Sequence, residues 1–161
     1  MMSAIREVQR ILHMLEDGLL ISVLTSMLLM AVVQICLRNF FDSGLLWGES
    51  FLRILLLWLA MLGAMVATRE SNHIRIDVLS RYLGPMSSKA MGLVTNLFSA
   101  VICSIVAYHA FEFVQFEFED KTIAFGNVPV WACQSIIPVG FFIIAVRFVI
   151  NGVVTVMPGK T

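Results

Sequence analysis

Residues 45–68 read LLWGESFLRILLLWLAMLGAMVAT and carry two opposite charges inside an otherwise apolar stretch. The uncharged part that follows Arg53 is 15 residues long, and at about 1.5 Å of rise per residue it falls short of the roughly 30 Å hydrocarbon core of a bilayer. A start at Trp47 gives 22 residues, which is enough to cross and puts the tryptophan at the interfacial depth that suits it. The sequence therefore predicts a transmembrane helix over 47–68 with Glu49 and Arg53 inside it.

The two charges lie four residues apart, so they share one side of the predicted helix and can pair, with the acid in the favourable N-terminal position. Small residues continue along the same side, and such strips let helices approach closely in membranes. Two interpretations remain: this side contacts another protein, or the pair only neutralises itself near the membrane surface. The candidate interface consists of Trp47, Glu49, Arg53, Ala60, Gly63 and Ala67. Leu56 and Ala64 lie on the same side of the predicted helix.

The composition extends the membrane interpretation to the whole chain. Of 161 residues, 59% are hydrophobic and 14% charged, whereas charged residues supply roughly a quarter of an ordinary soluble domain. The formal net charge is zero and charge runs are short, so nothing points to nucleic acid as a partner and we expect none. We predict a single all-α integral membrane domain over 1–161, with spans at about 18–37, 47–68, 90–111 and 129–149 and with small-residue strips that favour a compact bundle.

Two amphipathic segments accompany the spans. Residues 1–17 alternate apolar and charged residues at helical spacing, as in a helix that lies on a membrane surface or packs on a partner. Residues 74–83 predict a short interfacial helix with His73, Asp77 and Arg81. Because basic residues concentrate in these two segments, the positive-inside rule places both termini in the cytoplasm.

The fourth span carries two prolines and one charge. Pro129 suits the first helical turn, whereas Pro138 in the middle deprives the carbonyl of Gln134 of its helical partner and predicts a kink. Arg147 lies near the cytoplasmic end, where its side chain can extend to the surface.

Acidic residues concentrate on the opposite side of the membrane. The stretch EFVQFEFED alternates acids with phenylalanines before the fourth span. It is either a solvated extension of the third helix or a docking surface for a soluble protein outside the cell. The candidate docking residues are Asp42, Glu112, Glu117, Glu119 and Asp120.

No catalytic, phosphate-binding or metal-binding motif occurs, so we expect neither an enzyme nor a cofactor in this chain. A membrane anchor of a redox enzyme stays open as an alternative, although only His109 lies within a predicted span, with His13 and His73 outside. An autonomous small transporter is the other alternative, and against it no acid lies near the middle of any span.

The stretch WGESFLRILLLWLAMLGAMVATRESNHIRIDVL, followed by VPVWACQSIIPVGFFIIAVR, resembles the small membrane subunit, the Q or DctQ-like subunit, of tripartite ATP-independent periplasmic (TRAP) transporters. The matching features appear in order along nearly the whole chain. This family often has a second acid directly after the first, where this chain has Ser50. The matching residues are Trp47, Glu49, Arg53, Trp58, Gly63, Arg69, His73, Ile74, Ile76, Asp77, Pro129, Trp131, Pro138, Gly140 and Arg147.

The resemblance implies a function that the residues alone do not. In such systems a periplasmic solute-binding protein delivers an organic acid to a membrane complex, and the large M subunit carries the substrate and sodium sites. The small subunit is expected to be a fixed scaffold beside it, in the cytoplasmic (inner) membrane of a bacterium or archaeon. The expected partners are therefore the large subunit, the binding protein and membrane lipids.

Overall fold

The computed structural model of the chain describes residues 2–41, 44–45, 47–70 and 85–156. Over these residues it contains four helices long and apolar enough to cross a membrane, which confirms an all-α integral membrane protein. The elements are α1 (Met2–Phe41), α2 (Gly48–Glu70), α4 (Pro85–Asp120), β1 (Ile123–Phe125), β2 (Val128–Pro129), α5 (Val130–Gln134) and α6 (Ile136–Val156). The candidate spans are Leu12–Phe40, Gly48–Arg69, Ala90–Asp120 and Val130–Val153.

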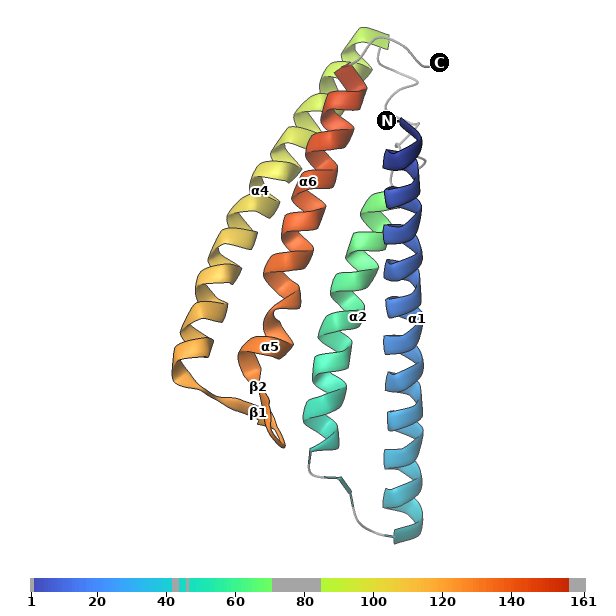
Figure 1. Ribbon diagram of the computed structural model, residues 1–161, viewed down its shortest axis with the longest axis vertical. Helices are drawn as coiled ribbons and strands as arrows, with labels where there is room; N and C mark the ends of the chain where they lie inside the picture. Colours follow the sequence, from blue (N-terminus) through green and yellow to red (C-terminus); the bar gives the residue numbers. More distant parts are fainter. Residues whose placement is uncertain (1, 42–43, 46, 71–84, 157–161) are drawn as a thin grey trace.

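The long helices form an open row instead of the compact bundle that we expected. Helix α1 packs on α2, α2 on α6, and α6 on α4, so that α1 and α4 lie at the two edges of the row (Figure 1). A compact bundle would require another helix to cover the small-residue side of α2. Within the described chain that side has no helical neighbour at Gly63, where an added Cβ would meet no atom within 4 Å.

The small core lies between α2 and α6. Met61, Leu62 and Met65 of α2 are buried against Ile136 and Ile144 of α6. Removing such apolar side chains from lipid contact brings no hydrophobic gain, so dense packing supplies most of the attraction in a membrane.

Glycines set how closely these helices approach. A Cβ added at Gly140 on α6 would lie 2.5 Å from Cε of Met61. On α1 and α2, a Cβ added at Gly48 would lie 2.1 Å from Nε2 of Gln34, so the α1–α2 contact also depends on a missing side chain. Real Cβ atoms do not approach so closely, and Gly48 and Gly140 are therefore positions where side chains of the neighbouring helix pack directly on a glycine.

The last span is divided at Ser135, which separates α5 from α6. Pro138 has no backbone N–H to bond the carbonyl of Gln134, the last residue of α5, which accounts for a break at this point. Pro138 thus lies in the first turn of α6 and not in the middle of a continuous helix. The indole N–H of Trp58 donates to the carbonyl oxygen of Cys133 at 2.9 Å and joins α5 to α2.

An antiparallel hairpin precedes this span and was not predicted from the sequence. Ile123 pairs with Pro129, and the turn contains Gly126 with φ of +55°, a conformation that favours glycine. Pro129 is the residue before α5, with φ of −73°, and so lies outside the helical turn where we expected it.

Two predicted boundaries also change. The predicted amphipathic segment continues without a break into the first span, because both belong to α1, a single helix of 40 residues. Helix α4 continues to Asp120, nine residues past the predicted end at 111, so its acids belong to helical turns and not to a loop. The predicted interfacial helix over 74–83 lies outside the described residues.

Candidate functional site

The first candidate site is the side of α2 that no described helix covers. Oε1 of Glu49 lies 3.1 Å from Nη2 of Arg53, so the predicted pair forms, and both side chains are 76% exposed. Glu49 is also in the first turn of α2, where the helix dipole favours a negative charge. The pair is therefore intact but has no protein around it in the isolated chain.

The same side of α2 stays open along its length. Leu56, Ala60 and Ala67 are exposed, and Gly63 faces open space. We call Glu49, Arg53, Leu56, Ala60, Gly63 and Ala67 the open face of α2. Opposite to it, Leu62 is fully buried, so one side of the helix serves the chain's own core and the other does not.

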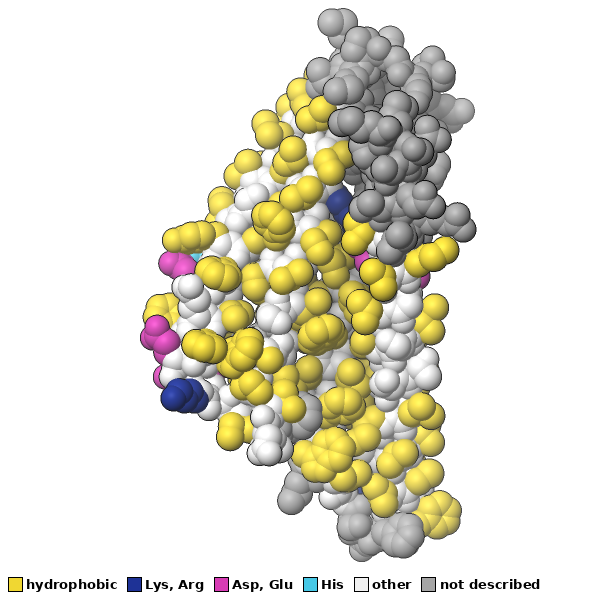
Figure 2. Space-filling view, viewed as in Figure 1, with side chains coloured by type: hydrophobic (Ala, Val, Ile, Leu, Met, Phe, Trp, Pro, Cys, Tyr) yellow, Lys and Arg dark blue, Asp and Glu magenta, His cyan; other side chains and the backbone are white. Residues whose placement is uncertain are grey.

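The open face differs in chemistry from the rest of the exposed surface. Large apolar side chains cover most of the molecule in Figure 2. On α4, for example, the exposed residues include Val94, Leu97, Phe98, Val101 and Ile105. Long flexible side chains suit contact with acyl chains, whereas small residues suit contact with another helix. The open face is therefore suited to a protein neighbour.

Trp47 directly precedes the first residue of α2 and lies next to the start of the open face. It is exposed and stacks edge-to-face with Phe51, with 6.1 Å between the ring centroids. An exposed tryptophan next to the start of a span is typical of the membrane–water interface. It marks the depth at which α2 enters the bilayer.

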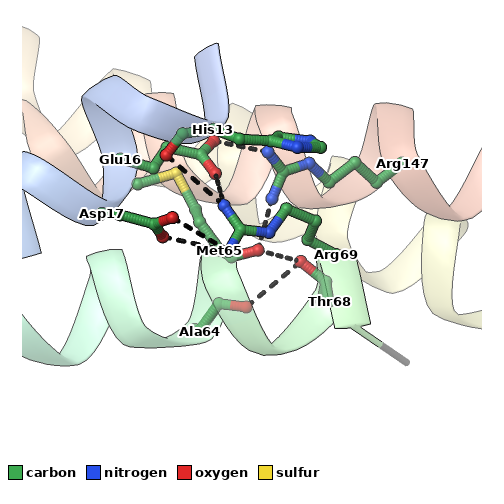
Figure 3. A network of polar contacts seen from close by, with 8 residues as sticks. All are labelled: His13, Glu16, Asp17, Ala64, Met65, Thr68, Arg69 and Arg147. Carbon is green, nitrogen blue, oxygen red and sulfur yellow. Dashed lines mark hydrogen bonds and ion pairs between the residues drawn. The ribbon is translucent and has the colours of Figure 1, made fainter. Parts of the chain in front are cut away.

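A second set of polar side chains joins α1, α2 and α6. It lies near the C-terminal ends of α2 and α6, at the other end of these helices from Glu49 and Arg53. We call Glu16, Asp17, Arg69 and Arg147 the polar cluster (Figure 3). Nη2 of Arg69 lies 3.0 Å from Oδ1 of Asp17 and 3.3 Å from Oδ2, and Nη1 lies 3.7 Å from Oε2 of Glu16. Arg147 donates to Oε1 of Glu16 and to the carbonyl oxygen of Met65.

Three side chains of the polar cluster are shielded while that of Asp17 is 48% exposed, and the formal charges of the cluster balance. The side chains of Glu16 and Arg147 are 12% and 18% exposed, and that of Arg69 is 17% exposed. Two acids and two arginines balance, which lowers the cost of placing ionised groups beside apolar helices. The cluster fixes α1, α2 and α6 relative to one another.

The sequence interpretation missed this cluster. We expected Arg147 to extend to the membrane surface, but its guanidinium instead turns to Glu16 and Met65 inside the row. The signal was present, because Glu16 and Asp17 directly precede the first apolar run while Arg69 and Arg147 end two other spans at the same side of the membrane. What the sequence did not give was which helices are neighbours.

The acidic end of α4 lies near the β-hairpin. Nδ1 of His109 lies 3.0 Å from Oε2 of Glu112, and the hydroxyl of Thr122 donates to Oε2 of Glu117 at 2.6 Å. Phe118 packs edge-to-face on Trp131, with 5.4 Å between the ring centroids. Glu119 and Asp120 are exposed. Of the predicted docking residues, Asp42 lies outside the described residues.

The histidines do not form the facing pair that a haem anchor needs. His13 lies on α1 and His109 on α4, at the two edges of the row (Figure 1). Among the described residues there is no group of three or more metal-binding side chains. His73, Asp77 and Arg81 lie outside the described residues.

The described chain therefore presents surfaces for packing and pairing, and its family is shown by comparison with known proteins. Residues 27–156 match the family model of tripartite ATP-independent periplasmic transporters, DctQ component. The chain belongs to this family. DctQ components are parts of transporters, in agreement with the predicted resemblance.

Individual relatives agree with this family. A Haemophilus influenzae protein provisionally named as a TRAP transporter small permease protein is 32% identical over 55% of this chain and 55% of its own length. The C4-dicarboxylate TRAP transporter small permease protein DctQ of Pseudomonas aeruginosa is 22% identical over 86% of this chain and 81% of its own. The matched region spans about half the length of the first of these relatives.

A third relative has a different chain organisation. The sialic acid TRAP transporter permease protein SiaT of Haemophilus influenzae is 26% identical over 81% of this chain but only 21% of its own length. SiaT therefore contains a region similar to this DctQ chain within a much longer polypeptide.

Proposed function

We propose that this chain is the small scaffold subunit of a sodium-driven TRAP transporter that imports an organic acid. In this proposal the open face of α2 binds the large membrane subunit and braces its immobile part while the transport domain moves. The large subunit holds the substrate and sodium sites, and this chain carries out no catalysis and holds no cofactor. The complex lies in the cytoplasmic membrane of a bacterium or archaeon.

The observation that carries the proposal is the open face itself. An ion pair with both side chains 76% exposed would be poorly solvated by hydrocarbon, and the exposed small residues beyond it leave room for a helix. The remaining apolar surface on α1 and α4 suits contact with lipid acyl chains.

The relatives support the rest of the proposal. SiaT joins a DctQ-like region to a longer permease in one polypeptide, which is the arrangement expected if the two parts function side by side. The names of the relatives mention sialic acid and C4-dicarboxylates, both organic acids, and for this chain we propose a substrate of that class.

The test is a purification in mild detergent through a tag on this chain, co-expressed with the large subunit of its own system. We expect equal amounts of the two subunits. The variant Gly63→Leu should lose the large subunit, because its side chain fills the open face.

Gly18→Leu on α1 is the matched control, since a Cβ added at Gly18 also meets open space. This variant should keep the large subunit. Normal transport by cells that lack this chain, or equal recovery with Gly63→Leu, would contradict the scaffold function.

We further propose that the acidic end of α4 helps to receive the periplasmic solute-binding protein. The acids lie in exposed helical turns beside the hairpin, where they are accessible at one end of the row. Neutralising Glu117, Glu119 and Asp120 together should raise the concentration of binding protein needed for half-maximal uptake. An unchanged concentration dependence would remove this part of the proposal.

A further inference from the structure

The ion pair on the open face of α2 has more hydrogen-bonding capacity than this chain uses. Arg53 donates through Nη2 to Oε1 of Glu49, and among the described residues its guanidinium has no other partner. A guanidinium offers five N–H donors, and an ionised carboxylate accepts through both oxygens. Most donors of Arg53 and one oxygen of Glu49 therefore have no partner within the described chain.

Glu49 and Arg53 lie within the first two turns of the candidate span. The span begins at Gly48, so Arg53 lies about 7.5 Å along the helix axis from that end. Unsatisfied polar groups in the hydrocarbon region are costly, and they are found there mainly where protein provides partners. Polar groups of a neighbouring molecule would therefore lower the cost of placing the pair in the span.

Two kinds of molecule could supply them, a lipid headgroup and a neighbouring protein. A headgroup would reach only the end of the helix near Trp47, whereas the open face continues to Ala67 as small exposed residues. The pair is also neutral already, so a phosphate would add a negative charge that nothing described on this face balances. A neutral polar side chain on a closely packed helix meets both conditions.

We infer that a helix of the large subunit packs along the open face and inserts an amide or hydroxyl side chain between Glu49 and Arg53. This inference rests on the proposed function and adds the chemistry of the contact. An amide accepts from the free N–H groups of Arg53 and donates to the free oxygen of Glu49. The planar guanidinium fixes the direction of its donors, so the contact also sets the axial register of the two helices.

The test compares replacements of the whole pair in co-purification with the large subunit. Replacing both residues by methionine, Glu49→Met with Arg53→Met, leaves a partner amide unsatisfied and should reduce recovery of the large subunit about tenfold or more. Replacing both by glutamine restores neutral donors and acceptors and should recover part of the loss. Size-exclusion profiles of the two variants alone should match that of the unmodified chain, because the pair is exposed there.

The opposite results are equally distinct. If the pair only neutralises itself, the double methionine variant will bind the large subunit as well as the unmodified chain, since apolar residues replace such pairs without loss. If a lipid phosphate completes the pair, the difference between the unmodified and double methionine complexes will be present in phospholipid nanodiscs and lost in a phosphate-free detergent after removal of lipid. Either result overturns the inference.

Failure of the scaffold function is recognised separately. In that case the unmodified chain recovers no large subunit, or Gly63→Leu recovers as much as the unmodified chain. A complex that is lost with Gly63→Leu but kept with the double methionine pair would leave the scaffold function standing and remove only the inserted side chain.

Discussion

The sequence correctly places Arg147 near the end of the fourth span but does not reveal which groups its side chain contacts. Its position near the end of an apolar run is visible in the sequence, and so is the need to satisfy its charge. The nearest solution is the membrane surface, but the structure provides Glu16 from α1 and the carbonyl of Met65 from α2. A contact between residues 131 positions apart cannot be read from local spacing.

This contact leads to a prediction for a single substitution. Arg147→Met should destabilise the isolated chain in detergent by about 2 to 3 kcal/mol, because it removes charged hydrogen bonds and leaves the largely shielded Glu16 with Arg69 alone at 3.7 Å. The measurement is the midpoint of unfolding in a series of SDS to mild-detergent mixtures. Adding Glu16→Gln to this variant should recover part of the loss, and no recovery would show that Arg147 does not act through Glu16.

The residues of α2 were easier to predict because they lie within one helix. A spacing of four residues fixes the Glu49–Arg53 contact whatever the neighbouring helices do, and the structure forms it at 3.1 Å. Which side of α2 stays uncovered depends on the positions of α1 and α6, and only the structure supplies these.

At the level of the elements, the two glycines of α2 have opposite surroundings. A Cβ at Gly48 would lie 2.1 Å from Nε2 and 3.2 Å from Cδ of Gln34, and 2.9 Å from Cε of Met30. A Cβ at Gly63 would meet nothing within 4 Å. Gly48 therefore belongs to the interface between α1 and α2, and Gly63 does not contribute to packing in the isolated chain.

Alanine at these two positions should separate internal packing from partner binding. Gly48→Ala should destabilise the chain by about 1 kcal/mol, the low end for overpacking, since only the flexible ends of the Gln34 and Met30 side chains must move away. Gly63→Ala should leave stability in detergent unchanged or slightly higher, because alanine favours the helix. Thermal unfolding of the two purified variants distinguishes them, and equal midpoints would contradict the close approach at Gly48.

The elements also differ in how much the sequence revealed of them. The four spans were predictable because 15 to 22 uncharged and mostly apolar residues in a row have few alternatives. The hairpin was not, since three residues of β1 and two of β2 are too short for a periodic pattern. The break at Ser135 was anticipated only as a kink at Pro138, because the lost hydrogen bond acts four residues earlier, at Gln134.

For the whole molecule, the open row has a simple topological consequence. The N-terminal end of α1 and the C-terminal end of α6 lie together, whereas the hairpin and the start of α2 lie at the other end (Figure 1). Because the number of spans is even, the first and last helices must have their outer ends on the same side of the membrane. The distribution of basic residues predicts that this side is cytoplasmic.

A labelling experiment tests the predicted orientation. In a background without Cys36, Cys103 and Cys133, the variant Asn127→Cys in the exposed hairpin turn should react with a membrane-impermeant maleimide in intact cells. Ser3→Cys should react only after the cells are opened. The reverse pattern would invert the topology and place the acidic end of α4 in the cytoplasm.

The polar cluster also has a consequence for the order in which the chain is synthesised and inserted. Glu16 and Asp17 are synthesised first, Arg69 follows 52 residues after Asp17, and Arg147 follows 131 residues after Glu16. Arg69 can therefore pair with both acids as soon as α2 has been made, whereas Glu16 gains its second arginine only with the last helix. A chain that stops before α6 has two carboxylates and one arginine in this group, so its formal charge reaches zero only when Arg147 has been added.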